Sequence, residues 1–144
     1  CQPSCISQRT DAFIGLGMGL TPSGDDFLGG ALFSLKSIYL SVPDIVFTDD
    51  KPCLEANRSR TNRISFTLLN DLADGHAIAP LHHIINGLIT GEASDRIFPF
   101  ISQLTRVGHS TGWDLLTGLL TGLLMTNRSH FFIPSFQVTK SLEI

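Results

Sequence analysis

Apolar residues recur along most of the chain at the three- and four-residue spacing that places them on one face of an α-helix. The clearest run contains Leu28, Leu32 and Leu35. Five such runs predict five helices around one core, so we expect an all-α fold. The expected helices span residues 23–39, 60–73, 80–89, 94–106 and 111–125.

The remaining stretches favour loops and short extended pieces. Residues 41–57 contain two prolines and three aspartates, which is typical of a surface linker, with a short extended piece expected at residues 45–47. Residues 131–138 are aromatic and contain Pro134, which favours an edge strand or an extended tail. With 144 residues the chain is long enough for one well-packed core, so residues 1–144 are expected to form a single helical domain.

Composition and charge narrow the classes of function. A net charge of -3 offers no basic surface for nucleic acid, and none is expected as a partner. The longest apolar stretch, residues 113–125, is short and interrupted by glycine and threonine, so no membrane partner is expected either. The 3 cysteines are too few and too sparse for a disulfide framework or a zinc site. This cysteine usage favours a reducing, cytoplasmic setting.

One stretch departs from the helical pattern, because residues 15–30 (GLGMGLTPSGDDFLGG) place glycines at alternate positions just before an apolar helix. Alternating glycines favour a tight loop that leads into a helix N-terminus. The free N–H groups and partial positive charge of such a terminus can bind an anion. A dinucleotide fingerprint would require glycine where Leu20 stands, and a phosphate-binding P-loop would require lysine where Asp25 stands.

The end of this stretch offers both a helix cap and candidate chemistry. Ser23 and Asp26 have the spacing of a capping box, in which Asp26 reaches back to the backbone of Ser23. Asp25 has no structural duty in this interpretation, so it is the first candidate catalytic residue, and Asp25→Asn is expected to leave stability almost unchanged. Its carboxylate could hold a bound N–H group or Mg²⁺, the one cofactor kept open, although the sequence shows no complete metal site. The expected ligand-binding residues here are Gly17, Gly19, Thr21, Ser23, Gly24 and Asp26.

A second stretch repeats this design, since residues 111–123 share glycine, aspartate and leucine with residues 23–35 at matching positions. Each segment also carries two small residues one helical turn apart, a spacing that lets two helices pack closely. We therefore expect the two helices to pair and the loops before them to converge on one polar cleft. His109 is the second candidate catalytic residue, although a lone histidine is more often structural. Ser110 and Thr111 are expected to complete the ligand site.

The glycine-rich stretch resembles the G-x-G-x-GLTPSGDDFL-x-G signature of a family that includes the AllH subunit of bacterial oxamate carbamoyltransferase. Two further stretches agree with that family, residues 61–69 (TNRISFTLL) and 107–118 (VGHSTGWDLLTG), so the resemblance spans about residues 13–125. Met18 stands where the family usually has proline. Family members are longer at the N-terminus, which implies that this chain is the C-terminal part of a longer family chain.

The resemblance implies a subunit of a carbamoyltransferase complex in anaerobic allantoin (purine) breakdown. Such a complex interconverts oxalurate plus phosphate with oxamate plus carbamoyl phosphate. The implied partners are the other subunits and a small anionic metabolite, namely carbamoyl phosphate, phosphate or oxamate. The alternative is a non-catalytic subunit that binds a metabolite or serves as a scaffold. The sequence shows no nucleophile–base pair that would decide between the two.

Overall fold

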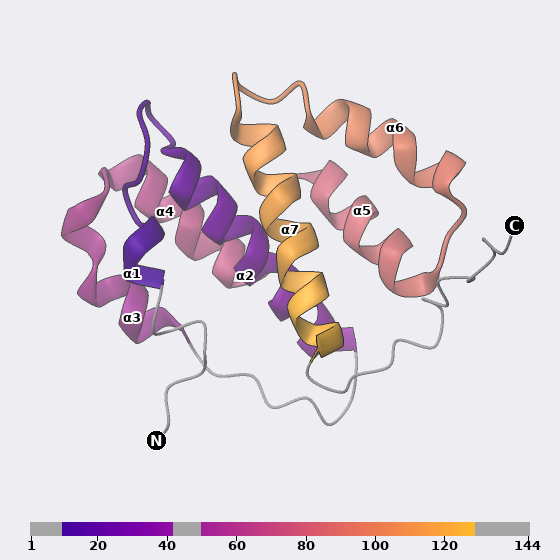
Figure 1. Ribbon diagram of the computed structural model, residues 1–144, viewed down its shortest axis with the longest axis horizontal. Coiled ribbons are helices and arrows are strands. Elements are labelled where there is room, and N and C mark those ends of the chain that lie inside the picture. The colour runs from indigo at the N-terminus through magenta and orange to yellow at the C-terminus, as the bar shows by residue number, and fades with distance from the viewer. Residues whose placement is uncertain (1–9, 42–49, 129–144) are drawn as a thin grey trace, which may run out of the picture.

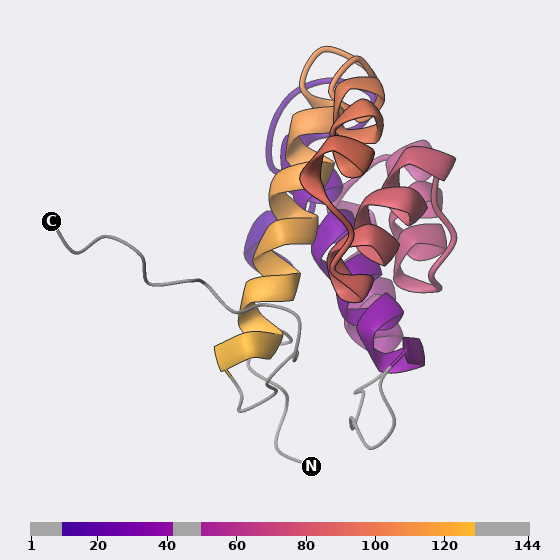
Figure 2. The same ribbon diagram turned by 90° about the vertical axis from the view of Figure 1, so that its right-hand side faces the viewer.

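The computed structural model describes residues 10–41 and 50–128, and within these stretches the regular structure consists of helices alone. Figure 1 shows their arrangement, and Figure 2 shows the same molecule from the side. The predicted all-α class is confirmed, whereas the extended pieces expected at residues 45–47 and 131–138 lie outside the described residues. The helices are α1 (Thr10–Phe13), α2 (Ser23–Ser41), α3 (Lys51–Ala56), α4 (Arg63–Ala73), α5 (Ala79–Thr90), α6 (Ser94–Leu104) and α7 (Thr111–Arg128), with a 3-10 turn, η1 (Arg58–Arg60), before α4.

The five predicted helices are present as α2, α4, α5, α6 and α7, with ends that shift by no more than one turn. The start of α4 is later than expected because η1 precedes it and Asn62 caps it. The Asn62 side chain accepts hydrogen bonds from the backbone N–H groups of Ile64 and Ser65, both at 3.0 Å. Interpreting all of residues 41–57 as a linker was wrong, because α3 forms there with Pro52 in its first turn and Leu54 fully buried.

The centre of the fold is α2, which packs against α7 on one side and α4 on the other. Gly30 of α2 lies against the backbone of Leu115 in α7, and Gly118 of α7 lies against the backbone of Phe27 in α2. The first turns of α2 and α7 therefore lie at the same end of the molecule, as Figure 1 shows. The side chain of Asn62, just before α4, also reaches this end, where it donates to the carbonyl of Leu20 at 2.8 Å.

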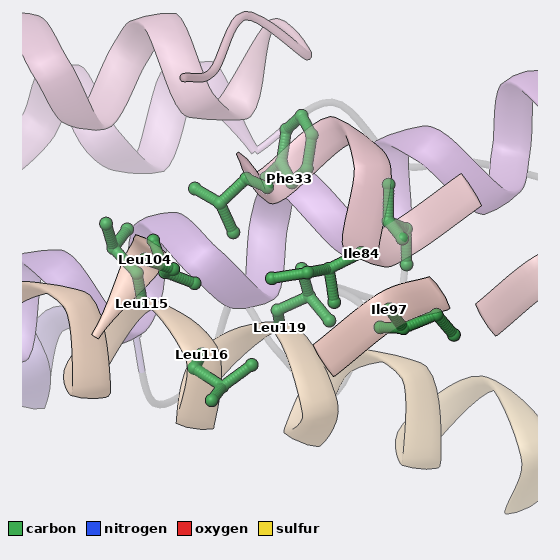
Figure 3. Close-up of a cluster of buried hydrophobic side chains, with 9 residues drawn as sticks. Phe33, Ile84, Ile97, Leu104, Leu115, Leu116 and Leu119 are labelled. Atoms are coloured by element: carbon green, nitrogen blue, oxygen red, sulfur yellow. The ribbon is translucent and has the colours of Figure 1, made fainter. Parts of the chain in front are cut away.

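Two clusters of buried hydrophobic side chains flank α2. One lies among α2, α5, α6 and α7 (Figure 3), and the other lies among α1, α2, α3 and α4. Because α2 contributes to both clusters, it is buried on two faces and its position is fixed. The first cluster contains Phe33, Leu81, Ile84, Ile85, Ile97, Leu104, Leu115, Leu116 and Leu119, and the second contains Ile14, Leu28, Leu32, Leu54, Phe66 and Leu69.

Among the described helices, none combines the length and the apolar character that crossing a lipid bilayer would require.

Candidate functional site

The first turns of α2 and α7 meet through four hydroxyl side chains. The hydroxyl oxygens of Thr21 and Thr111 lie 3.0 Å apart, and those of Ser23 and Ser110 lie 3.4 Å apart. These pairs join residues that are far apart in the sequence, so the two loops meet as predicted, whereas the single polar cleft expected between them remains a prediction. We call this region the junction, and it comprises Thr21, Ser23, Asp26, Ser110, Thr111 and Asp114.

Two glycines in equivalent positions make the junction possible. A side chain at Gly24 would overlap the carbonyl oxygen of Phe13, and one at Gly112 would overlap the carbonyl oxygen of Leu104. Each glycine thus lets its helix begin directly against the segment that leads into it. The resemblance between the two sequence segments therefore extends to how each helix starts.

Asp25 lies on the opposite side of α2 from α7 and is fully committed to local structure. It is 2% exposed, and its carboxylate accepts the backbone N–H of Gly15 at 2.7 Å and the hydroxyl of Ser65 at 2.6 Å. The hydroxyl of Thr61 also donates to it. The expectation that Asp25 has no structural duty is wrong, because this carboxylate ties the glycine-rich loop to the start of α4.

The glycine-rich loop has the backbone conformation that its sequence predicts. Gly15, Gly17 and Gly19 have φ angles of 75°, 113° and 104°, which residues other than glycine rarely adopt. Gly17 and Gly19 are exposed, and so are the apolar side chains between and after them, with Met18 94% exposed. The loop reaches solvent at the same end of the molecule as the junction, and its expected ligand contacts remain a prediction.

Asp26 is one of two junction residues with an unpartnered carboxylate oxygen. It is 6% exposed, its carboxyl group is hydrogen-bonded by the side chains of Thr111 and Thr21, and its Oδ2 has no partner among the described residues. The pKa of Asp26 is raised to about 6, mainly because the carboxyl group is buried. The hydrogen bonds from Thr111 and Thr21 lower the pKa, and the charges of Asp114 and Asp25 raise it by smaller amounts. Asp114 also has a buried Oδ2 without a partner in the described part of the chain.

A cavity of about 380 Å³ opens beside Asp26, between α4, α5 and α7; we call it the Asp26 cavity. Its wall is mostly apolar, and its polar side chains belong to Asp26, Asp71, His76 and Thr111. None of the described residues that line it is a lysine or an arginine, so it offers no strong cation to a phosphate or carboxylate. A neutral group with N–H donors fits both the apolar wall and the unpartnered oxygen. The remaining lining residues are Leu68, Leu72, Ala77, Ile78, Leu81, Val107 and Leu115.

The predicted site residues do not all lie together. The junction gathers Thr21, Ser23, Asp26, Ser110 and Thr111. Gly24 is buried beneath the loop, and Asp25 faces α4. His109 is exposed at the start of α7 and makes no hydrogen bond or ion pair within the described part of the chain.

Sequence reasoning missed the contribution of Asp71 and His76 to the cavity. They belong to the end of α4 and the loop that follows it, and no motif marks either residue. Their place depends on how α4 and α5 pack, which is a tertiary property. For residues 10–41 and 50–128, no group of three or more histidine, cysteine, aspartate or glutamate side chains could hold a metal ion. The carboxylate at which Mg²⁺ was kept open, that of Asp25, already accepts three hydrogen bonds.

Comparison with known proteins places the chain in a family. A family model described as oxamate carbamoyltransferase subunit AllH matches residues 13–123. The match includes the glycine-rich loop, the start of α4 and the junction. No solved structure was found to match the chain. Because the match covers most of the sequence, the chain belongs to the family of oxamate carbamoyltransferase subunit AllH.

Proposed function

We propose that this chain acts as a subunit of an oxamate carbamoyltransferase complex and that the Asp26 cavity binds the carbamoyl-bearing substrate. The complex would interconvert oxalurate plus phosphate with oxamate plus carbamoyl phosphate, as a step in allantoin breakdown. The family membership supports the subunit role. The placement of substrate rests on the site geometry.

The observation that carries the placement is the buried, unpartnered Oδ2 of Asp26 beside a cavity. A buried carboxylate oxygen without a donor is costly, and a ligand that supplies an N–H group removes that cost. Oxalurate, oxamate and carbamoyl phosphate each carry an NH2 group next to a carbonyl, whereas inorganic phosphate carries none. The amide end of the substrate would therefore enter the Asp26 cavity, and its anionic end would lie elsewhere.

The chemistry that Asp26 could perform follows from its pKa of about 6. As a carboxylate it accepts an N–H of the carbamoyl group and holds that group in place. Attack of phosphate on the carbamoyl carbon breaks the C–N bond of oxalurate, and the departing nitrogen must gain the proton that phosphate loses. A carboxyl group that titrates near neutral pH is suited to carry that proton. Thr111 would orient Asp26 through its hydroxyl group.

The two residues that the sequence suggested as catalytic, Asp25 and His109, are not assigned the transfer chemistry in this proposal. Asp25 would position the glycine-rich loop through its three hydrogen bonds. His109 stands at the start of α7, where a direct role in transfer remains a prediction. The expected loop contacts of Gly17 and Gly19 also remain predictions.

A role as a scaffold within the complex is the second candidate, and the outer face of α7 favours it. Trp113, Leu120 and Leu124 are 57%, 41% and 59% exposed, and residues 115–126 carry no charge. The hydroxyl of Thr117 donates to the carbonyl of Trp113 in its own helix, so this face offers few polar groups to water. Uncharged faces with tryptophan and leucine are typical of subunit interfaces. This role is compatible with substrate binding at the junction.

The test of the proposed function uses the complex assembled from purified subunits. Carbamoyl phosphate formation from oxalurate and phosphate is measured with the wild-type chain and with Ala77→Phe, which places a ring in the Asp26 cavity. The matched control is Ala79→Phe, an exposed position of α5 that does not line the cavity. We expect Ala77→Phe to raise KM and lower kcat/KM at least tenfold, with Ala79→Phe unchanged. Equal activity of the two variants would place the substrate outside this cavity.

A further inference from the structure

Three basic residues lie close together in one short segment of the chain. Arg58, Arg60 and Arg63 fall within six residues, although the whole chain has only 10 lysines and arginines and a net charge of -3. These arginines lie at η1 and the start of α4. This segment lies within residues 13–123, which the family model matches, and none of its residues lines the Asp26 cavity.

A second cavity, of about 470 Å³, lies at this segment, and we call it the arginine cavity. Two of the three arginines, Arg58 and Arg63, line it, whereas Arg60 does not. Ser59 and Thr61 add hydroxyl groups, although the hydroxyl of Thr61 is already used by Asp25. The other lining residues are Glu55, Ala56 and Phe66.

The two lining arginines are available for a ligand. Within the part of the chain that the structure describes, neither Arg58 nor Arg63 lies in an ion pair, whereas Arg60 lies 3.9 Å from Asp11. The guanidinium of Arg58 lies 5.3 Å from the ring centre of Phe66, a buried residue, which limits its freedom. An arginine held in place in this way loses less conformational entropy when it binds an anion.

The backbone N–H groups at the start of α4 are not available to bind an anion in the arginine cavity. The N–H groups of Ile64 and Ser65 are already taken by the Asn62 side chain. Anion recognition must therefore come from the guanidinium groups, with Ser59 as an additional donor. Glu55 is the one carboxylate among the lining residues, so the balance of charge stays positive.

We infer that the arginine cavity is an oxyanion site, in which Arg58 and Arg63 bind a phosphate or carboxylate group. Guanidinium groups present paired N–H donors that match the oxygens of both groups. The assignment rests on the proposed function only for the choice of anion. Phosphate, carbamoyl phosphate and oxamate all carry such oxygens, and the Asp26 cavity supplies no strong cation for them.

The test is calorimetric titration of the full chain at constant ionic strength, with inorganic phosphate in one arm and oxamate in the other. We expect phosphate to bind wild type, and Arg58→Gln and Arg63→Gln each to weaken binding by roughly tenfold or more, the usual effect of losing a hydrogen bond to a charged group. Arg60→Gln is the matched control, because it removes the same charge outside the cavity. Arg63→Lys keeps the charge but loses the paired donors, so it should also weaken binding.

The arms separate the outcomes. If oxamate competes with phosphate, the site binds both planar carboxylates and tetrahedral anions. If only phosphate binds, the site is specific for tetrahedral anions. Either result supports the inference. Absence of phosphate and oxamate binding, or an equal loss in Arg60→Gln and Arg63→Gln, overturns it. Melting temperatures identify a variant that fails to fold. Arg58 and Arg63 are both exposed, so the variant that still folds then tests the inference. A negative result in this titration would not bear on the proposed function, because Ala77→Phe tests the other cavity.

Discussion

Gly30 and Gly118 lie against each other's helices in the same way. A side chain at Gly30 would overlap the carbonyl oxygen of Leu115, and a side chain at Gly118 would overlap the carbonyl oxygen of Phe27. This reciprocal contact brings the axes of α2 and α7 close together and sets their first turns side by side. The junction is a consequence of that close approach.

Replacing Gly118 with alanine should therefore destabilise the fold. A methyl group there meets backbone, which cannot move aside as a side chain can, so we expect a loss of about 1–3 kcal/mol in the free energy of unfolding. Urea denaturation measures it. Thr117→Ala, one residue away on the exposed face of α7, is the control and should change stability by less than about 0.5 kcal/mol. Equal stability of the two variants would show that the helices are not in close contact at Gly118.

Asp25→Asn should also destabilise the fold, in contrast to what the sequence indicated. An amide cannot accept from all three donors, so at least one of Gly15, Thr61 and Ser65 loses its partner. Each buried donor left unsatisfied costs about 1–3 kcal/mol. Thermal unfolding measures the loss, with Asp11→Asn at an exposed position as the control. A melting temperature equal to that of wild type would show that the hydrogen bonds of Asp25 do not stabilise the fold.

Stability should depend on the ionisation of Asp26. Its pKa is raised from 3.8 to about 6 in the folded chain, so between these values the folded state binds more protons than the unfolded state. The contribution of Asp26 to the free energy of unfolding therefore falls as pH rises through this window and is level above about pH 7. Asp26→Asn removes this contribution.

The measurement compares wild type and Asp26→Asn by denaturation across the same pH range. The difference in stability, wild type minus variant, should decrease from about pH 4 to about pH 7 and then stay constant. Parallel pH profiles for the two proteins would mean that Asp26 titrates normally when folded. Asp11→Asn again serves as the control, because its carboxylate is exposed.

Assembly with the other subunits should depend on the outer face of α7. Trp113→Ser removes the largest exposed side chain of that face, and a central interface tryptophan often contributes about 2 kcal/mol or more to binding. We expect a loss of affinity of about 30-fold or more, measured by surface plasmon resonance. Tyr39→Ser, at an exposed aromatic residue of α2, is the control. If both variants bind as wild type does, the interface lies elsewhere.

Much of the fold could be predicted because its helices carry strong apolar periodicity. The pairing of α2 with α7 was also predictable, since glycines such as Gly30 and Gly118 mark a close approach. The short helix α3 was missed because two prolines and several aspartates dominate its surroundings, and what stabilises it is the burial of Leu54 by other elements.

The meeting of the two loops could be predicted from the sequence, but the surroundings of the two aspartates could not. Neighbouring residues on a helix point about 100° apart, so Asp25 and Asp26 face different helices. Which of them finds donors depends on α4, whose Thr61 and Ser65 satisfy Asp25 and leave Asp26 with an open oxygen. No local pattern in the glycine-rich stretch contains that information.

The central claim is that Asp26 binds the amide end of the carbamoyl substrate, and steady-state kinetics of the assembled complex test it most directly. Asp26→Asn keeps the shape of the side chain but replaces one of its two acceptor oxygens with an NH2 group and removes the negative charge. We expect kcat/KM for oxalurate to fall by roughly 100-fold, the size of a lost hydrogen bond to a buried charge, while the complex still assembles. Asp11→Asn should be as active as wild type. Assembled Asp26→Asn complex with kcat/KM within twofold of wild type would contradict the claim.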